Sequence, residues 1–277
     1  MQNNNTKEEL LTFGGHLEVL RLMLFRVLIV VVLFSVVIFC FKRETFEILL
    51  APSEYTFSTF SAIEKVLNYV GWQFHFEPYH IDLISTELSA QFMTHISTSF
   101  ILGILFSSPY ILYELFKFIS PALYENERKY STKVAGIIFL LFISGVLMSY
   151  FVLFPISFQF LANYKVNERV VNTITLESYI STFTTLTFLM GIVFQLPVIA
   201  YFLGKIGLVD ANLLKQYRPY AFVLIMVIAA IITPPDIMTL ILVTIPLYAL
   251  YELSIWVLRR FCEINDQESE ILDCSID

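Results

Sequence analysis

Two glutamates stand beside two cations in residues 116–130, "FKFISPALYENERKY". A hydrophobic run ends at Ile119, and Glu125, Glu127, Arg128 and Lys129 follow within ten positions. Cations beside an apolar run indicate membrane topology, whereas acidic residues contribute little to that signal. A carboxylate matches the planar fork of a guanidinium, a geometry that a lysine ammonium cannot copy. The glutamates therefore need an explanation other than topology.

The rest of the chain offers no catalytic constellation. There is no Gly-x-Ser-x-Gly elbow, no His-Glu-x-x-His pair and no phosphate loop. His75, His80 and His95 lack metal-ligand spacing, and we expect them on the surface of a polar connection. The three cysteines form no spaced set. We therefore expect a protein that is not an enzyme and has no metal and no cofactor.

The composition is that of an integral membrane protein. Of the 277 residues, 57% are hydrophobic and 15% are charged, and the mean hydropathy is +0.73. Soluble domains are about 45–50% apolar and about 25% charged. The polar, acidic N-terminus has no basic region or cleavage site of a secretory signal. Nothing in the charge pattern indicates a nucleic-acid partner.

Six apolar stretches are candidates for membrane spans, since about 20 apolar residues cross the hydrocarbon core. The fifth has only about 13 residues, which is about 20 Å of helix. The predicted spans are 22–41, 92–119, 134–162, 179–203, 220–232 and 237–258. An even number of spans places both termini on one side of the membrane.

The distribution of lysine and arginine assigns that side to the cytoplasm. Twelve of the seventeen basic residues fall in segments on the side of the termini, and five fall on the opposite side. The five are Lys42, Arg43, Lys65, Lys165 and Arg169. Without the short fifth span, the segments after it would change sides and the excess of basic residues on the side of the termini would be reduced. The distribution of lysine and arginine therefore also favours six spans.

Prolines predict the shape of the bundle. Pro109, Pro155, Pro197 and Pro246 lie within predicted spans, where each removes a backbone donor and clashes with a carbonyl one turn earlier. Membrane helices also tolerate proline better than soluble ones do. Together with the short fifth span, the prolines favour a concave bundle of kinked helices.

The sequence allows fewer structural predictions for the connections between the spans and for the C-terminal tail. The long outer loop 42–91 contains "FSAIEKVLNYVGWQFHF", which predicts an amphipathic helix on the outer leaflet. We expect a single transmembrane domain over residues 1–262. Residues 263–277 predict an acidic, disordered cytoplasmic tail.

A few polar residues fall inside predicted spans. Gln195 lies mid-way along the fourth span, where its amide either contacts a ligand or partner helix or bonds to another helix of the bundle. Glu114 and Glu252 lie near the cytoplasmic ends of their spans, within reach of Lys117 and Arg259 in sequence. Asp236 in "TPPD" predicts the cap of the sixth helix.

Seven motifs in order give the chain a resemblance to a known family. They are "HLEVLR", "APS", "SSPYILYELFKFISPALYENERK", "SYFVLFP", "FQLPV", "YRPY" and "TPPD". In this order, and over nearly the whole chain from about His16 to Arg260, they resemble the TatC family. That family is the multi-spanning signal-peptide receptor of the twin-arginine protein translocase. The string "FISPALYENER" is the most specific of the seven.

The resemblance implies a receptor for signal peptides that carry two consecutive arginines. It assigns recognition to the N-terminal segment and the first cytoplasmic loop, with Glu127 as the arginine partner. Further contacts that it implies are Glu18, Glu125, Arg128, Arg21, Phe118, Pro121, Leu123 and Tyr124. It also implies intramembrane polar or partner contacts at Gln195, Thr233, Asp236 and Pro52.

The chain departs from the family pattern at two of these places. In the family motif "HLxELR" a glutamate stands where this chain has Val19, and Glu18 is the nearest carboxylate. One residue is about 100° of helical rotation, so Glu18 points elsewhere unless the segment is unwound. The family often has glutamate where this chain has Gln195, and a neutral amide cannot attract a cation.

The function that we expect is the receptor and core subunit of the twin-arginine, Sec-independent translocase in the inner membrane. The resemblance implies single-span TatA/TatB-type partners, membrane lipid, a homo-oligomer within the complex and the proton-motive force. The alternative is a secondary transporter for a small solute. That alternative requires an ionisable site at mid-membrane depth or an inverted repeat, and the sequence offers only the neutral Gln195.

Overall fold

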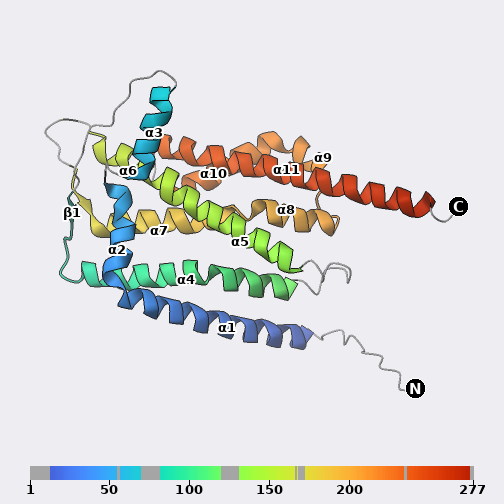
Figure 1. Cartoon of the computed structure of the whole chain (residues 1–277), viewed down its shortest axis with the longest axis horizontal. Coiled ribbons are helices and arrows are strands. Elements are labelled where there is room, and N and C mark those ends of the chain that lie inside the picture. The colour runs from blue at the N-terminus through green and yellow to red at the C-terminus, as the bar shows by residue number, and fades with distance from the viewer. Residues whose placement is uncertain are drawn as a thin grey trace. The chain divides into compact units, whose positions relative to one another are not determined.

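The computed structural model describes residues 13–54, 57–69, 82–119, 131–165, 167, 172–233 and 236–274. Within these ranges the chain is mostly helical (Figure 1). The helices are α1 (Phe13–Cys40), α2 (Lys42–Leu50), α3 (Ser58–Tyr69), α4 (Ala90–Ile119), α5 (Ser131–Met148), α6 (Phe154–Asn163), α7 (Leu176–Val193), α8 (Leu196–Lys205), α9 (Ala211–Gln216), α10 (Arg218–Ile232) and α11 (Ile237–Cys274). The structure also contains two short strands, β1 (Leu83–Ile84) and β2 (Ile174–Thr175), a 3-10 turn (Ala51–Ser53) and a π-helical segment (Ser149–Leu153).

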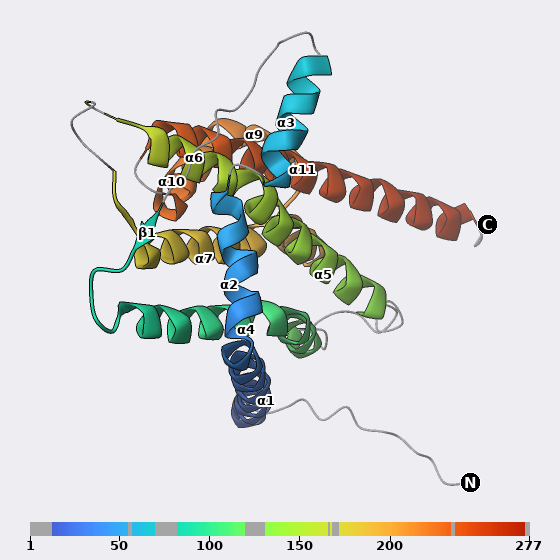
Figure 2. The ribbon, with the colours of Figure 1, turned by 60° about the vertical axis from the view of Figure 1, so that its left-hand side comes forward.

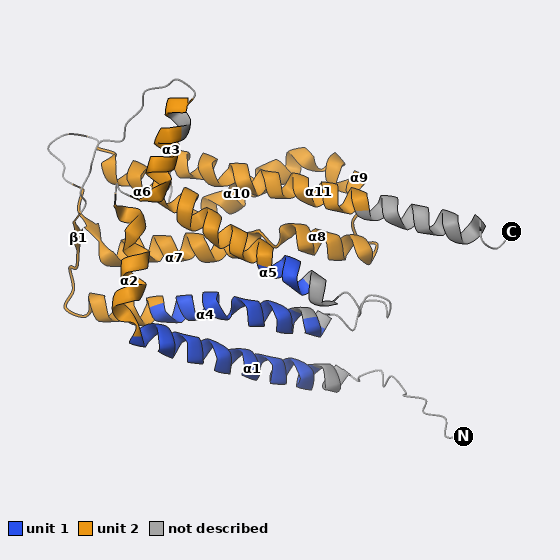
Figure 3. Cartoon of the chain, in the orientation of Figure 1, with its two compact units in different colours: residues 1–40, 99–139 blue, residues 41–98, 140–277 orange. Residues whose placement is uncertain are grey.

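The chain divides into two compact units (Figure 3). Unit 1 comprises residues 1–40 and 99–139, and unit 2 comprises residues 41–98 and 140–277. The boundaries fall within α4 and α5, so each of these helices contributes to both units. The single transmembrane domain over residues 1–262 stays a prediction.

Five helical stretches are long and apolar enough to cross a membrane. They are Leu17–Cys40, Ala90–Leu115, Ala135–Asn163, Leu176–Lys205 and Ile237–Arg260. The chain is therefore mostly helical with five candidate membrane spans, and each of them overlaps a predicted span. The remaining predicted span corresponds to α10, which is apolar but has 15 residues, about 22 Å of helix.

The prolines act in two ways. Pro197 stands at the start of α8, which begins at Leu196 after α7 ends at Val193. Pro155 stands at the start of α6, directly after a π-helical segment, Ser149–Leu153. Pro109 and Pro246, in contrast, lie inside α4 and α11. Two of the four prolines therefore accompany a change of helix, and two are accommodated within one.

A residue outside the span satisfies the carbonyl that Pro155 leaves free. A proline cannot donate to the carbonyl four residues earlier, which here belongs to Phe151. The hydroxyl of Thr59 on α3 donates to this carbonyl. The ring of Phe57 packs edge-on against Tyr150 and parallel to Phe151. Helix α3 is thereby attached to the third span within unit 2 (Figure 2).

Helix α3 covers the first part of the segment for which the sequence predicts an amphipathic helix. Phe60 on this helix is buried, whereas Ser61 and Lys65 are exposed. The apolar side of α3 thus packs on protein within unit 2. Its predicted position on the outer leaflet stays a prediction, and residues 70–81 lie outside the described residues.

Two tyrosines hold the end of α2. The last carbonyls of a helix lack intrahelical donors. Tyr179 of α7 donates its hydroxyl to the carbonyl of Leu49 over 2.9 Å, and Tyr150 donates to that of Ile48 over 2.9 Å. Pro52 follows in a 3-10 turn, Ala51–Ser53, and is fully buried. The "APS" motif therefore ends α2 at a fixed point on the third and fourth spans.

A short parallel pairing joins two connections of unit 2. Leu83 pairs with Ile174, and Ile84 pairs with Thr175. The first connection lies between the first two long spans, and the second lies between the third and fourth. The pairing therefore adds a second tie between the 42–89 connection and the start of α7.

In unit 1, α1 and α4 approach closely. A Cβ atom on Gly103 would meet the Oγ atom of Ser35 at 2.0 Å, so only glycine allows this contact. Met23, Val31 and Ile38 are buried at spacings of eight and seven residues along α1, which is one face of a helix. The close approach at Gly103 determines which side chains of α1 lie opposite which side chains of α4.

Two expectations about other residues differ from the structure. His95 is buried, with its ring edge-on to Phe46, because it lies on the packed side of α4 and not in the polar connection. His75 and His80 lie outside the described residues.

Helix α11 continues to Cys274, although the sequence predicts a disordered tail from residue 263. No glycine or proline follows Pro246 in the chain, so nothing there breaks the helix.

We predict that Tyr179→Phe destabilises unit 2 more than Tyr150→Phe does. Tyr179 is buried, and its loss leaves the Leu49 carbonyl without its donor, which costs about 1–3 kcal/mol. Tyr150 is only half-buried, so water or lipid headgroups replace more of its bond. Thermal unfolding of both variants in detergent measures the difference. Equal midpoints for the two variants would contradict the assigned role of Tyr179.

Candidate functional site

A buried carboxylate pairs with a cation in unit 1. The Oε2 atom of Glu114 on α4 lies 3.2 Å from the Nη2 atom of Arg26 on α1. The hydroxyl of Tyr110 donates to the Oε1 atom of Glu114 over 3.1 Å. The Glu114 side chain is only 5% exposed, whereas that of Arg26 is 48% exposed. The pair therefore joins a buried anion to a half-exposed cation.

The local sequence explains how these three side chains meet. Tyr110 and Glu114 are four residues apart on α4, so they lie on one face of that helix. Arg26 follows the buried Met23 by three residues, which places it beside the buried stripe of α1. The close approach of the two helices at Gly103 then brings Arg26 to the level of Glu114.

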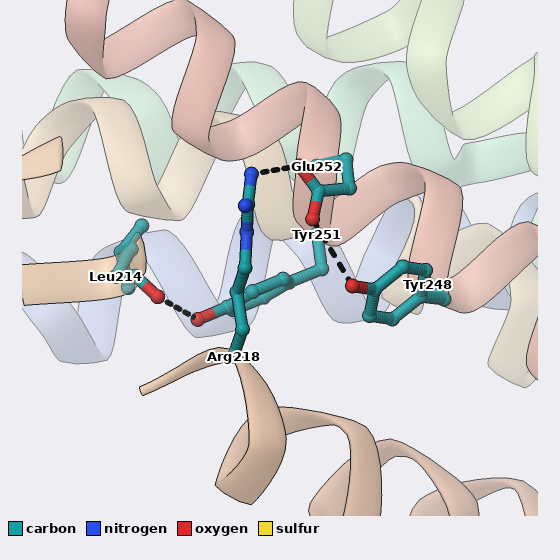
Figure 4. A network of polar contacts seen from close by, with 5 residues as sticks. All are labelled: Leu214, Arg218, Tyr248, Tyr251 and Glu252. Carbon is teal, nitrogen blue, oxygen red and sulfur yellow. Dashed lines mark hydrogen bonds and ion pairs between the residues drawn. The ribbon is translucent and has the colours of Figure 1, made fainter. Parts of the chain in front are cut away.

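Unit 2 contains a second network of the same kind (Figure 4). Arg218, at the start of α10, donates from Nη2 to the Oε2 atom of Glu252 on α11 over 2.7 Å. The hydroxyl of Tyr248 donates to Oε1 of Glu252 over 3.1 Å. The hydroxyl of Tyr251 donates to the carbonyl of Leu214 over 2.7 Å. This network ties α9, α10 and α11 together.

The two networks share a sequence pattern. Residues 110–115 read "YILYEL" and residues 248–253 read "YALYEL". In both, the first tyrosine donates to the glutamate, and an arginine from another helix pairs with the glutamate. They differ in burial, because the Glu252 side chain is 36% exposed against 5% for Glu114.

The arginines were not identified from the sequence. The sequence places Lys117 near Glu114 and Arg259 near Glu252, but the cations that pair with the glutamates are Arg26 and Arg218. Lys117 is three residues from Glu114, yet its side chain is exposed while Glu114 is buried. The repeated "Y-x-L-Y-E-L" pattern is the signal that could have indicated two equivalent sites.

Most of the residues expected to bind a signal peptide fall in one segment that the structure does not describe. Pro121, Leu123, Tyr124, Glu125, Glu127 and Arg128 lie outside the described residues. Phe118 is half-buried near the end of α4. That segment follows directly on the helix that carries Glu114, so α4 leads from the buried carboxylate to the predicted loop site.

Glu18, Val19 and Arg21 lie on the helix α1 and are exposed. Glu18 and Val19 follow one another within the unbroken helix α1, so they point about 100° apart. Arg21 is exposed, and its guanidinium carbon lies 5.6 Å from the ring centre of Phe25. The Glu18 side chain therefore does not point where a glutamate at the position of Val19, the family position, would point.

The other predicted contacts are buried or partly buried in unit 2. Gln195 is 8% exposed and stands at the junction of α7 and α8. The hydroxyl of Thr233 donates to the carbonyl of Ala229 over 2.9 Å. Asp236 accepts a 2.7 Å bond from the backbone of Thr239, which confirms that it caps α11. Pro52 is buried at the end of α2.

Unit 2 also contains two cavities without charged lining residues. One, of about 310 Å³, is lined by Phe222 and Met226 of α10 and by Leu240, Ile241, Thr244 and Tyr248 of α11. The other, of about 490 Å³, lies among Phe154, Ser157, Phe158, Tyr179, Leu186 and Thr233. Within the described part of the chain, no three His, Cys, Asp or Glu side chains gather as a metal-ligand set.

Comparison with known proteins identifies the family to which the chain belongs. The long apolar helices define a multi-pass membrane protein. The sequence model of the family described as Sec-independent protein translocase protein (TatC) matches residues 15–246. The chain belongs to the TatC family.

Individual relatives agree with this assignment. The chain is 35% identical over 257 residues to the Sec-independent protein translocase protein TatC of Blattabacterium sp. subsp. Periplaneta americana, covering 91% of this chain and 96% of the relative. It is 32% identical to the TatC protein of Campylobacter jejuni, covering 92% and 97%. A crystal structure of the twin-arginine translocase receptor TatC superposes with a TM-score of 0.70 at 31% identity, covering 88% of this chain and 98% of that one.

We predict that Arg26→Gln destabilises the protein more than Arg218→Gln. The first variant leaves the buried Glu114 without its cation, which costs about 2–3 kcal/mol. The second breaks a pair whose two side chains are each more than a third exposed, and such pairs contribute about 1 kcal/mol or less. Unfolding free energies of both variants, measured in the same detergent, test this order. A larger loss of unfolding free energy for Arg218→Gln would show that Glu114 does not depend on its arginine more than Glu252 does.

Proposed function

We propose that the protein is the receptor and core subunit of the twin-arginine, Sec-independent translocase. In this role it binds the twin-arginine signal peptides of folded proteins and assembles the export complex. The observation that carries the proposal is the match to the TatC family over residues 15–246. The 0.70 TM-score to a TatC receptor over most of both chains supports it.

The signal peptide binds at the cytoplasmic face, in this proposal, with Glu127 as the partner of an arginine. A carboxylate accepts two parallel bonds from a guanidinium, whereas an ammonium offers a point charge. Glu18, Glu125, Arg128, Arg21, Phe118, Pro121, Leu123 and Tyr124 complete the contact region. The hydrophobic part of the signal then lies in the bundle near Gln195, whose burial beside the break between α7 and α8 supports a polar spot at that depth.

Single-span TatA/TatB-type subunits dock against α10 and α11. The uncharged cavity of about 310 Å³ between these helices supports this position, because an apolar helix needs an apolar groove. Pro52, Thr233 and Asp236 contribute to partner contacts, directly or by holding the surrounding backbone. The assembled complex is oligomeric and uses the proton-motive force.

The proposed topology has six spans in the inner membrane with both termini in the cytoplasm. Helix α10 is the fifth of these six spans, and its 15 residues require local thinning of the bilayer. The bias of lysine and arginine toward the side of the termini supports the orientation.

We predict that Glu127→Gln reduces the preference for arginine over lysine in the signal peptide. A charge-assisted bond in a desolvated site contributes about 1.5–3 kcal/mol, so the twin-arginine peptide should lose about tenfold or more in affinity. Binding of twin-arginine and twin-lysine peptides to the protein in nanodiscs measures the effect. If the variant keeps the wild-type preference, Glu127 is not the arginine partner.

We also predict that Cys274 is closed to reagents outside the cell. With Cys40 and Cys262 replaced by serine, a membrane-impermeant maleimide should label Cys274 only after spheroplasts are disrupted. Ser85→Cys, in the connection between the first two spans, is the matched control and should label in intact spheroplasts. Labelling of Cys274 in intact spheroplasts would contradict the six-span topology.

A further inference from the structure

The ion pair of unit 1 is built as a site for an exchangeable cation. We propose that Glu114 binds a guanidinium of the signal peptide, and that Arg26 occupies this carboxylate when no peptide is bound. The inference rests on the proposed function, because it names a further specificity-determining residue for the same ligand. Its observation is independent of the loop, since all three side chains belong to α1 and α4 of unit 1.

The resident cation is held loosely. The Nη2 atom of Arg26 lies 3.2 Å from the Oε2 atom of Glu114, farther than the 2.7 Å between Arg218 and Glu252, and the Arg26 side chain remains 48% exposed. An arginine with half of its surface outside can swing its head group into water or headgroups along its flexible stem. The exchange of Arg26 for another guanidinium therefore leaves the number of ion pairs unchanged.

The carboxylate itself stays in place during such an exchange. Tyr110 donates to Oε1 of Glu114 from the same helix, independently of Arg26. An ionised carboxylate has about four acceptor positions on its two oxygens, so an incoming guanidinium can approach while Tyr110 remains bound. Glu114 lies five residues before the end of α4 at Ile119, which is about 7.5 Å along the helix axis.

The resident arginine also gives the site its selectivity. A buried glutamate without a cation would be strongly destabilising, so the empty receptor needs an internal partner. A ligand must then compete with a guanidinium for the same carboxylate. A second guanidinium can do so on equal terms, whereas a lysine ammonium lacks the planar fork. The site thus rejects lysine without any further contact.

The network of unit 2 provides a control with matched chemistry. Arg218 donates a shorter bond of 2.7 Å to Glu252, and Glu252 is less buried than Glu114. Tyr251 of the same helix is bonded to Leu214 of α9. These bonds join three helices, which is a structural role, so we expect no peptide exchange at Glu252.

The test measures peptide affinity for the full chain in nanodiscs. Fluorescent signal peptides with Arg-Arg, Lys-Arg, Arg-Lys and Lys-Lys are titrated against the wild type, Glu114→Gln, Arg26→Lys and the control Glu252→Gln. Arg26→Lys keeps both charges of the pair and so protects the fold. Thermal unfolding of each variant shows that it is folded.

The exchange predicts opposite effects for the two partners. Glu114→Gln should weaken the Arg-Arg peptide about tenfold and should erase the preference for arginine at one of the two positions. Arg26→Lys should strengthen the Arg-Arg peptide about threefold or more, because the competitor is weaker. Glu252→Gln should leave all four affinities unchanged.

A purely structural pair would behave differently. If Glu114→Gln leaves the affinities unchanged, or if Arg26→Lys weakens the Arg-Arg peptide as Glu114→Gln does, the exchange is wrong. The proposed function survives either result as long as the wild type prefers Arg-Arg over Lys-Lys. If the wild type shows no such preference, the proposed function itself fails, and this inference fails with it.

Discussion

Inside a bilayer, every polar group must find its partner within the protein, because lipid offers none. Among the described residues, the polar groups that have partners find them in three ways. Hydroxyls of Thr184, Thr244 and Ser254 donate to carbonyls one turn earlier in their own helices. Thr59 and Tyr179 donate to carbonyls in other elements. Two glutamates pair with arginines from neighbouring helices and with tyrosines of their own.

The same constraint connects the fold of unit 1 to its proposed role. A receptor for a cationic peptide needs a carboxylate, and a carboxylate at the end of a span needs a cation before the peptide arrives. Arg26 supplies that cation, and its half-exposed position allows it to leave. In unit 2 the equivalent arginine has a shorter bond, and its network, which includes the bond of Tyr251 to Leu214, joins three helices. The two networks thus use one pattern for two purposes.

The sequence predicts the spans well and the contacts between them poorly. Long apolar runs can form little but membrane helices, so the five long spans lie within a few residues of their predicted bounds. Asp236 is predictable as a cap because its partner is three residues away. Arg26 and Glu114 are far apart in sequence, and their contact depends on the rotation of α1 and on the close approach at Gly103. The burial of His95 and the π-helical segment before Pro155 depend on packing in the same way.

The most direct test of the account is to find where the two arginines of a bound signal peptide lie. A signal peptide with a photo-reactive residue next to its arginines is bound to the full chain in nanodiscs, irradiated, and mapped by mass spectrometry. The account predicts cross-links to α1 and α4 within unit 1, and their loss when both arginines are lysines. Cross-links confined to unit 2, or cross-links that persist with lysine, would contradict it.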